Sequence, residues 1–284
     1  MPMRLSDNLA RRWRRVTRLK RPVFLHIPKT GGTYLGQLET DWRVRQPVVD
    51  PLTSLGHATL IDTTKPVPHR YPPTGMGEQF ATPTSRLKNA YVVTTVRNPF
   101  DWLVSYAGHA GGWNPSYCDP GHYDYEPARR SFGELIRAIA DREDPWPSRK
   151  FLFMQAFSSS GDLMVDWFCR NESLHDDLTQ LAKAKRLAYT QRPKQRVGKR
   201  RDYRTYYDDR LVDLVYQTWG RELALYGYGF DGPNDDALLH GPIDASTRRA
   251  VRYTWHDDTM TIAAELDWSA TPHATRDQAL AHCA

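Results

Sequence analysis

The feature that most constrains the fold is an apolar run followed at once by a glycine turn, in "RPVFLHIPKTGGTYL". Residues 21–27 are apolar enough to form a buried parallel strand, and residues 33–39 have helix-forming character. Gly31 and Gly32 allow a tight turn between the two. This order places backbone N–H groups at a helix N-terminus, where they bind anions, and Lys29 adds a full positive charge. The stretch therefore predicts a phosphate site within an α/β domain.

A second strand and helix follow in "AYVVTTVRNPFDWLVSY". Ala90 to Val96 is β-branched and uninterrupted, which predicts a buried strand, and a helix is expected from Pro99. Arg97, at the end of that strand, can bind a phosphate through two N–H groups, and the hydroxyl of Ser105 can reach the same group. Two phosphate sites on separate strand–helix units imply a ligand with phosphate at two ends.

The rest of the chain has no internal repeat and no linker strong enough to require a second domain. Further strands are expected at residues 58–61 and 162–169, and helices at 132–141, after a capping box of Ser173 and Asp176, at 210–225 before Gly227, and at 260–266. Residues 108–130 are rich in Gly, Pro and Tyr and predict a long surface loop, a type of segment that often carries function. The pattern predicts one α/β domain with a C-terminal extension.

Composition and charge narrow the class of protein. The hydrophobic content of 40% is typical of a globular enzyme, and the sequence has no apolar run of the ~18 residues that a membrane-spanning helix needs. The three cysteines, Cys118, Cys169 and Cys283, have no paired spacing, which argues against a disulfide framework or a zinc site and favours a cytoplasmic location.

The positive charge is concentrated in one segment. Residues 1–20 carry a net charge of +6, which is also the net charge of the whole chain. Apolar residues recur at helical spacing among the arginines of this arm. Two interpretations are open: a helix resting on an anionic membrane surface, which would make the protein membrane-peripheral, or a solvated helix packed on its own domain.

Both phosphate motifs, in this order, resemble those of the sulfotransferases that use 3′-phosphoadenosine 5′-phosphosulfate (PAPS), specifically the carbohydrate sulfotransferases and their bacterial relatives. "HIPKTGGT" is similar to the 5′-phosphosulfate loop of that family, and "RNPFDWLVSY" to its 3′-phosphate motif. "VDWFCRNESLHDDL" and "RDYRTYYDDRLVDLVYQTWGRELALYGYGFD" resemble its later strand–helix passage and its C-terminal helix. The resemblance covers residues 22–231 and says little about the acceptor.

The resemblance implies a P-loop-like three-layer α/β fold, with a central parallel sheet between helices. Together with the charge of residues 1–20 and the weaker pattern after residue 230, it predicts a basic arm at 1–20, a sulfotransferase domain at 21–231 and an extension packed on it at 232–284. It implies PAPS as the donor, adenosine 3′,5′-bisphosphate as the product, and no metal and no nucleic acid. The residues expected to bind the donor are Lys29, Thr30, Gly31, Gly32, Thr33, Tyr34, Arg97, Ser105, Arg192, Lys199, Arg201 and Tyr203.

The expected chemistry is in-line transfer of the sulfuryl group to an acceptor hydroxyl of a glycan or another natural product. Lys29 is expected to stabilise charge on the bridging oxygen, and His57, in "SLGHATLID", to act as the base. His26, His109 and Glu78 are the other candidates for the base. Acceptor contacts are expected from residues of the 108–130 segment, namely His109, Trp113, Tyr117 and Tyr123.

Two other functions are left open by the sequence. One is a nucleotide-triphosphate-dependent kinase of the wider P-loop type, although no Lys-Ser or Lys-Thr pair follows the glycines. The other is a non-catalytic module that binds anions or a membrane surface through residues 1–20. The three readings differ in whether binding requires magnesium and whether it requires the arm.

Overall fold

A computed structural model was used, and it describes only part of the chain. The described residues are 21–31, 34–35, 54–56, 59–61, 63–64, 81–88, 90–111, 124–141, 153–191, 200–256 and 259–264.

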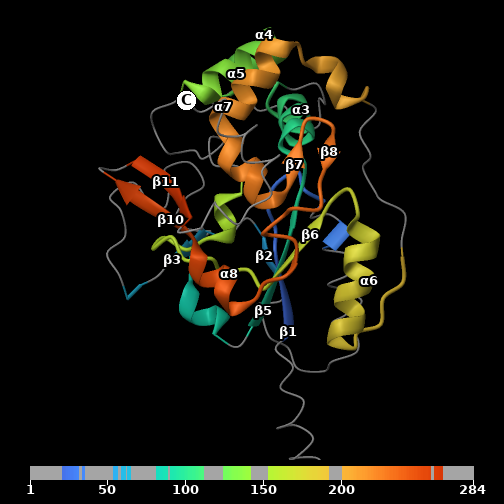
Figure 1. Ribbon diagram of the computed structural model, residues 1–284, viewed down its shortest axis with the longest axis vertical. Helices are drawn as coiled ribbons and strands as arrows, with labels where there is room; N and C mark the ends of the chain where they lie inside the picture. Colours follow the sequence, from blue (N-terminus) through green and yellow to red (C-terminus); the bar gives the residue numbers. More distant parts are fainter. Residues whose placement is uncertain are drawn as a thin grey trace, which may run out of the picture.

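The described elements begin with the strands β1 to β4, and most of the helices follow β5 (Figure 1). The strands are β1 (Arg21–Leu25), β2 (Ser54–Gly56), β3 (Thr59–Ile61), β4 (Ala81–Pro83), β5 (Ala90–Val96), β6 (Trp167–Arg170), β7 (Tyr228–Gly229), β8 (Gly232–Pro233), β9 (Gly241–Pro242), β10 (Val251–His256) and β11 (Thr259–Ala264). The α-helices are α3 (Pro99–Ala110), α4 (Tyr125–Arg130), α5 (Phe132–Ala140), α6 (Leu174–Lys185), α7 (Asp209–Tyr226) and α8 (Ala245–Ala250). The short 3-10 helices are η2 (Thr84–Leu87), η4 (Met154–Ala156) and η5 (Tyr203–Tyr206).

A mostly parallel sheet forms the centre of the fold. Its strand order is β2-β1-β5-β6-β9, in which the first four strands are parallel and β9 is antiparallel to β6. The chain passes from β1 to β2 on one side and later to β5 on the other, so β1 and β5 flank the point where the strand order reverses. Ligands of open α/β sheets bind at the carboxyl ends of the strands at such a point.

Each face of the sheet is covered by its own core. Val23, Leu25 and Val92 belong to the larger cluster, which contains the buried residues of α3, α5 and α7. The alternate residues Phe24 and Val93 belong to a smaller cluster with the buried leucines of α6. Since side chains alternate along a strand, β1 and β5 are buried on both faces, as expected for strands that read as unbroken apolar runs. The protein is therefore an α/β protein with helices on both sides of its sheet (Figure 1).

The strands at 21–27 and 90–96 and the helices from Pro99, at 132–141 and at 210–225 are confirmed. Helix α3 begins as its sequence indicates, with Pro99 in the first turn and the Asn98 side chain accepting a hydrogen bond from the Phe100 N–H at 3.0 Å. Helix α7 ends at Gly227, which has a φ of 61°.

Four local expectations were wrong. The helix expected at residues 260–266 is not formed by residues 260–264, because "TMTIAA" pairs antiparallel with "VRYTWH" as strands β11 and β10. The strand expected at 162–169 begins at Trp167, because residues 158–162 form a turn in which the Ser158 N–H donates to the Asp162 carbonyl. Ser173 makes no cap bond and donates to Asp177 instead. Both ends of the 108–130 segment are helical, in α3 and α4.

Candidate anion-binding site

The turn after β1 has an unusual backbone conformation. Lys29 has a φ of 65° and Gly31 a φ of 106°, both in the left-handed region. A non-glycine residue is uncommon there. At Gly31 a side chain is also excluded by space, because a Cβ would lie 2.7 Å from Asn171 Nδ2. Strain of this kind gathers at functional sites when the surroundings hold it in place.

The surroundings hold this turn by its carbonyl oxygens. Five consecutive carbonyls, from Ile27 to Gly31, accept hydrogen bonds. The bonds are Thr30 Oγ1 to the Ile27 oxygen at 2.7 Å, Trp102 Nε1 to Pro28 at 2.8 Å, Arg97 Nη1 to Lys29 at 3.0 Å, Asn171 Nδ2 to Thr30 at 2.8 Å, and the Tyr34 N–H to Gly31 at 2.9 Å. Three of these donors come from the segments that follow β5 and β6.

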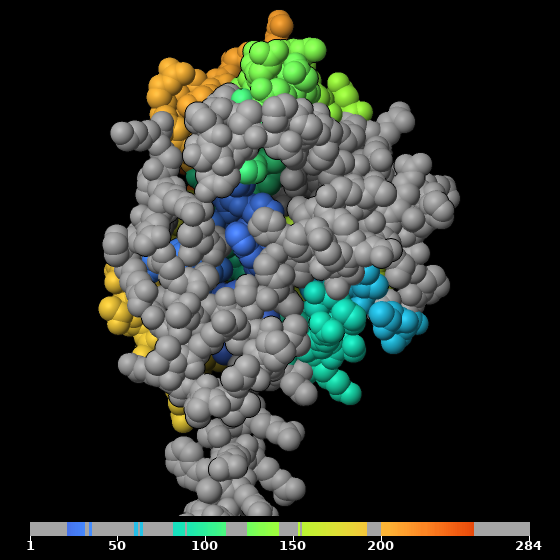
Figure 2. Space-filling model, turned by 180° about the vertical axis from the view of Figure 1, so that it is seen from behind, coloured from blue at the N-terminus to red at the C-terminus, as the bar shows by residue number. Residues whose placement is uncertain are grey.

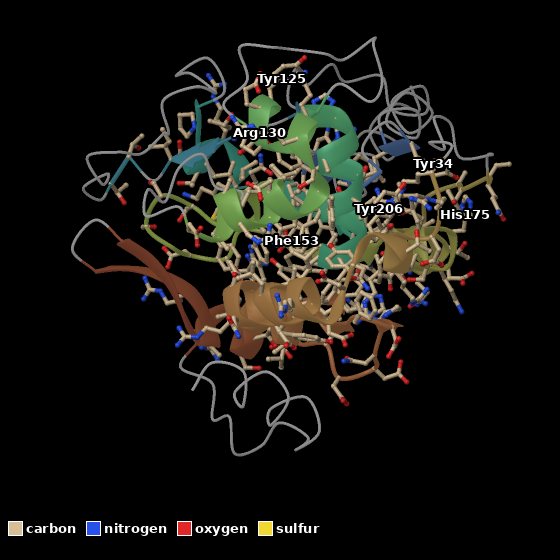
Figure 3. The ribbon with its side chains drawn as sticks, turned by 90° about the horizontal axis from the view of Figure 1, so that it is seen from above. Tyr34, Tyr125, Arg130, Phe153, His175 and Tyr206 are labelled. Carbon is tan, nitrogen blue, oxygen red and sulfur yellow. The ribbon has the colours of Figure 1, made fainter. Side chains whose placement is uncertain are left out.

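Tyr34 contributes to the other side of the sheet. Its hydroxyl lies 3.2 Å from His175 Nδ1 and 2.9 Å from the Tyr189 hydroxyl, which itself lies 2.8 Å from His175 Nδ1. Tyr34 and His175 lie next to one another in Figure 3. Burial, reinforced by the bond to Tyr34, raises the pKa of Tyr189. Tyr34 therefore anchors the turn to α6 through His175.

Arg97 stands at the carboxyl end of β5, beside the turn. Its Nε donates to Asp101 Oδ2 at 2.6 Å, and its Nη2 lies 2.5 Å from the same oxygen. Arg200 contacts the other carboxylate oxygen of Asp101 through its own guanidinium. Burial lowers the pKa of Arg97 and Asp101 opposes that effect, but an arginine keeps its charge in proteins. Two cations therefore converge on one partly buried carboxylate.

Ser105 lies on the same face of α3 as Asp101, one turn further along, and is half-buried. This face of α3 thus carries the carboxylate of Asp101 and the hydroxyl of Ser105. Arg97 lies just before the first turn of the helix. The arrangement brings Arg97, Asp101 and Ser105 to the same end of the sheet as the glycine turn.

Arg200 was missed by the sequence analysis, which singled out its neighbours. The guanidinium of Arg201 lies 5.4 Å from the ring centre of Tyr206, and Arg201 is exposed. Tyr203 donates its hydroxyl to the Phe230 carbonyl, and burial raises its pKa to about 12. Tyr207 donates to the Phe100 carbonyl at 2.8 Å. These tyrosines fix η5 against the start of α3 and so set which arginine reaches Asp101.

A second group that was not predicted from the sequence, Asn98 with Glu172, joins the ends of β5 and β6. Glu172 accepts from the Asn98 N–H and from the Tyr228 hydroxyl, both at 2.8 Å. The Asn98 side chain donates to the Gly229 carbonyl at 2.9 Å. Asparagine before a proline and glutamate after a strand give no distinctive sequence signal, so only the fold reveals this role. Together they fix the backbone on which Arg97 stands.

Several predicted site residues lie outside the described residues: Gly32, Thr33, His57, Glu78, Trp113, Tyr117, Tyr123, Arg192 and Lys199. Of the other candidates for the base, His26 directly follows β1 and His109 lies near the end of α3, and both are half-buried. Part of the blue segment that contains β1 and the turn is visible on the face of the molecule shown in Figure 2.

No family model, no curated protein and no solved structure matches this chain. Among the residues that the structure describes, no cluster of three or more His, Cys, Asp or Glu side chains is arranged to hold a metal ion. Within the same residues no helix has the length and apolar character needed to cross a bilayer.

Proposed function

We propose that this protein is a PAPS-dependent sulfotransferase with a P-loop-like fold. The observation that carries the proposal is the meeting of two anion-binding elements at the ends of adjacent strands. The glycine turn follows β1 and Arg97 follows β5, and the bond from Arg97 Nη1 to the Lys29 carbonyl joins them. A donor with phosphate groups at both ends of an adenosine has the chemistry to use both.

The residues of the turn fit the sulfated end of such a donor. The carbonyls of residues 27–31 are bonded to the protein, so the turn would offer a ligand its backbone N–H groups and the positive charge of Lys29. Donors held in advance at a site of developing negative charge are the strongest source of rate in this kind of transfer. Lys29 would stabilise charge on the oxygen that bridges phosphorus and sulfur.

Arg97 and Arg200 fit the 3′-phosphate, with Ser105 as a further donor. Two guanidinium groups can bind one phosphate through several parallel hydrogen bonds. Asp101 holds both in place while the site is empty and neutralises one of the two charges. A ligand that lacks the 3′-phosphate, such as ATP, would leave this pair without a partner. That is the physical basis for preferring PAPS over a nucleoside triphosphate.

In the proposed reaction the acceptor hydroxyl forms a new bond to sulfur. At the same time the bond between sulfur and the bridging oxygen breaks, and adenosine 3′,5′-bisphosphate leaves. The acceptor's proton passes to a base, for which His57 is our candidate. The donor supplies the activated sulfuryl group, and the protein supplies position and charge.

Thermal-shift titration separates this proposal from a kinase and from an anion-binding arm. We expect adenosine 3′,5′-bisphosphate to stabilise the protein in the presence of a chelator, and to do so more than ATP with magnesium or anionic vesicles. In Arg97→Ala the affinity for the bisphosphate should fall about 100-fold, because a charged hydrogen-bonding partner and one support of the turn are both lost. Stabilisation by ATP and magnesium alone would instead indicate a kinase.

The matched control is Arg129→Ala. Arg129 lies on α4, is 60% exposed and pairs with Glu126 at 3.6 Å. An exposed pair of this kind contributes little, so this variant should bind like the wild type. Equal losses in both variants would point to a general charge effect and would contradict the assignment.

A further inference from the structure

Two of the carbonyl contacts of the turn come from side chains with no charge to offer a ligand, Trp102 and Asn171. Trp102 is 2% exposed and donates its indole N–H to the Pro28 carbonyl at 2.8 Å. Its ring is stacked on that of Tyr106, with centres 5.0 Å apart and planes at 12°. The hydroxyl of Tyr106 in turn donates to the buried Asp124. The indole is therefore fixed by packing on one side and aimed at the turn on the other.

Asn171 approaches the turn from the next strand. Its backbone N–H donates to the Val96 carbonyl at 2.8 Å, which places it at the end of the β5–β6 pairing. Its side-chain amide donates to the Thr30 carbonyl at 2.8 Å, and the same nitrogen lies 2.7 Å from the position that a Cβ of Gly31 would take. Glycine at 31 is thus required both by its φ of 106° and by the presence of Asn171.

The two contacts fall on either side of Lys29, the residue with the unfavourable φ of 65°. A lysine in the left-handed region is less stable than in extended or helical backbone by about 1 kcal/mol. Fixing the Pro28 carbonyl orients the Pro28–Lys29 peptide, which carries the Lys29 N–H, and fixing the Thr30 carbonyl orients the Thr30–Gly31 peptide, which carries the Gly31 N–H. Because a peptide is planar and trans, a carbonyl held against the protein turns the attached N–H the opposite way.

We propose that Trp102 and Asn171 are positioning residues for donor binding. They hold the turn with its N–H groups and Lys29 directed at the sulfated end of the donor, and they make no contact with the donor themselves. This inference rests on the proposed function. It adds that recognition of the 5′ end depends on two neutral side chains, one from inside α3 and one after β6.

The test compares ligands that differ only at the 5′ end. In Trp102→Phe the ring remains for stacking on Tyr106 and the N–H donor is lost. We expect about 10-fold weaker binding of adenosine 3′,5′-bisphosphate, the equivalent of one buried hydrogen bond, and unchanged binding of adenosine 3′-monophosphate. Asn171→Ala should likewise weaken binding of the bisphosphate and leave binding of the 3′-monophosphate unchanged. Both affinities can be measured by calorimetry.

Trp219→Phe is the matched control. Trp219 is a fully buried tryptophan of α7, and its indole N–H has no partner among the described residues. The same chemical change there should leave both affinities unchanged. A purely structural role for Trp102 would weaken the binding of both ligands by the same factor, and that result, or no change in the binding of either ligand, would overturn the proposal.

Inorganic pyrophosphate distinguishes failure of this inference from failure of the proposed function. If the wild type binds pyrophosphate but neither nucleotide, and Trp102→Phe weakens pyrophosphate binding, the positioning role stands and the sulfotransferase assignment falls. If the wild type binds none of the three, both fall. If it binds the bisphosphate and Trp102→Phe does not weaken that binding, only the positioning role falls.

Discussion

Trp102 and Trp219 are both buried tryptophans of helices, α3 and α7, yet their surroundings differ. Both are buried, at 2% and 0% exposure. The N–H of Trp102 has a partner in the Pro28 carbonyl, whereas that of Trp219 has none among the described residues. Trp219 also has non-helical angles (φ −123°, ψ 16°) within α7. Trp102 belongs to a region in which the buried polar groups are hydrogen-bonded. Trp219 belongs to a region in which some buried polar groups have no hydrogen-bond partner among the described residues.

The region around Trp219 includes two further buried polar side chains on the same stripe of α7. Glu222 and Tyr226 follow three and seven residues later, and the hydroxyl of Tyr226 also has no partner among the described residues. Burial raises the pKa of Glu222 to about 8, with its own backbone hydrogen bond and Arg221 opposing the shift. Burial, with Glu222 as a second cause, raises the pKa of Tyr226.

The comparison shows two outcomes of burying polar groups. Around the turn, buried donors meet carbonyls and fix a strained backbone in one geometry. Along α7, a buried carboxyl without a strong cationic partner takes up a proton instead, as desolvation requires. The first region is suited to binding, and the second makes stability depend on pH.

The largest effect we expect is on that pH dependence. Glu222 has a folded-state pKa of about 8 against 4.5 in the unfolded chain. The contribution of Glu222 to the free energy of unfolding is therefore fully present below pH 4.5. This contribution is lost as the pH rises through about 8. Glu222→Gln should remove this loss and raise the free energy of unfolding at pH 7 by about 3 kcal/mol.

Urea unfolding from pH 5 to pH 9 measures this prediction. The control is Glu126→Gln, an exposed glutamate of α4 whose side chain is 56% exposed. That change should shift stability little and by the same amount at each pH. If Glu222→Gln gives a stability curve parallel to that of the wild type, Glu222 is ionised in the folded protein and the contrast between the two regions is wrong.

A smaller effect is expected from the paired region. Arg200→Ala removes one of the two cations on Asp101 and should weaken binding of adenosine 3′,5′-bisphosphate about 10-fold. Arg201→Ala, one residue later, removes a cation that lies against Tyr206 and should weaken binding less than twofold. Calorimetry at two salt concentrations measures both affinities. A larger loss in Arg201→Ala than in Arg200→Ala would show that Arg201, and not Arg200, contacts the bound ligand.

The sequence was sufficient to predict those parts of the fold that depend on local pattern. β1 and β5 were predicted because strands buried on both faces read as continuous apolar runs. The start of α3 was predicted from Pro99, and its relation to Arg97 followed from the chain order. These are properties of neighbouring residues.

What the sequence could not supply depends on contacts between distant segments. Arg200 is selected over Arg201 by Tyr203 and Tyr207, which bind the Phe230 and Phe100 carbonyls. A tryptophan such as Trp102 inside a helix is typical of a core residue, and nothing in its neighbours reveals a bond to Pro28. A helix was expected at residues 260–266, whereas residues 259–264 form β11, because a short segment rich in Thr and Ala is compatible with either structure.

The smallest effect sets the two tryptophans directly against each other. Trp102→Phe and Trp219→Phe remove the same atoms from equally buried rings, so the loss of packing is similar in both. Trp102→Phe also leaves the Pro28 carbonyl without its donor, which destabilises by about 1 kcal/mol more, whereas Trp219→Phe removes an N–H that had no partner. The difference between the two free energies of unfolding should therefore be about 1 kcal/mol, with Trp102→Phe the less stable. Equal values would mean that Trp219 has a partner beyond the described residues, and that α7 is as fully paired as the turn.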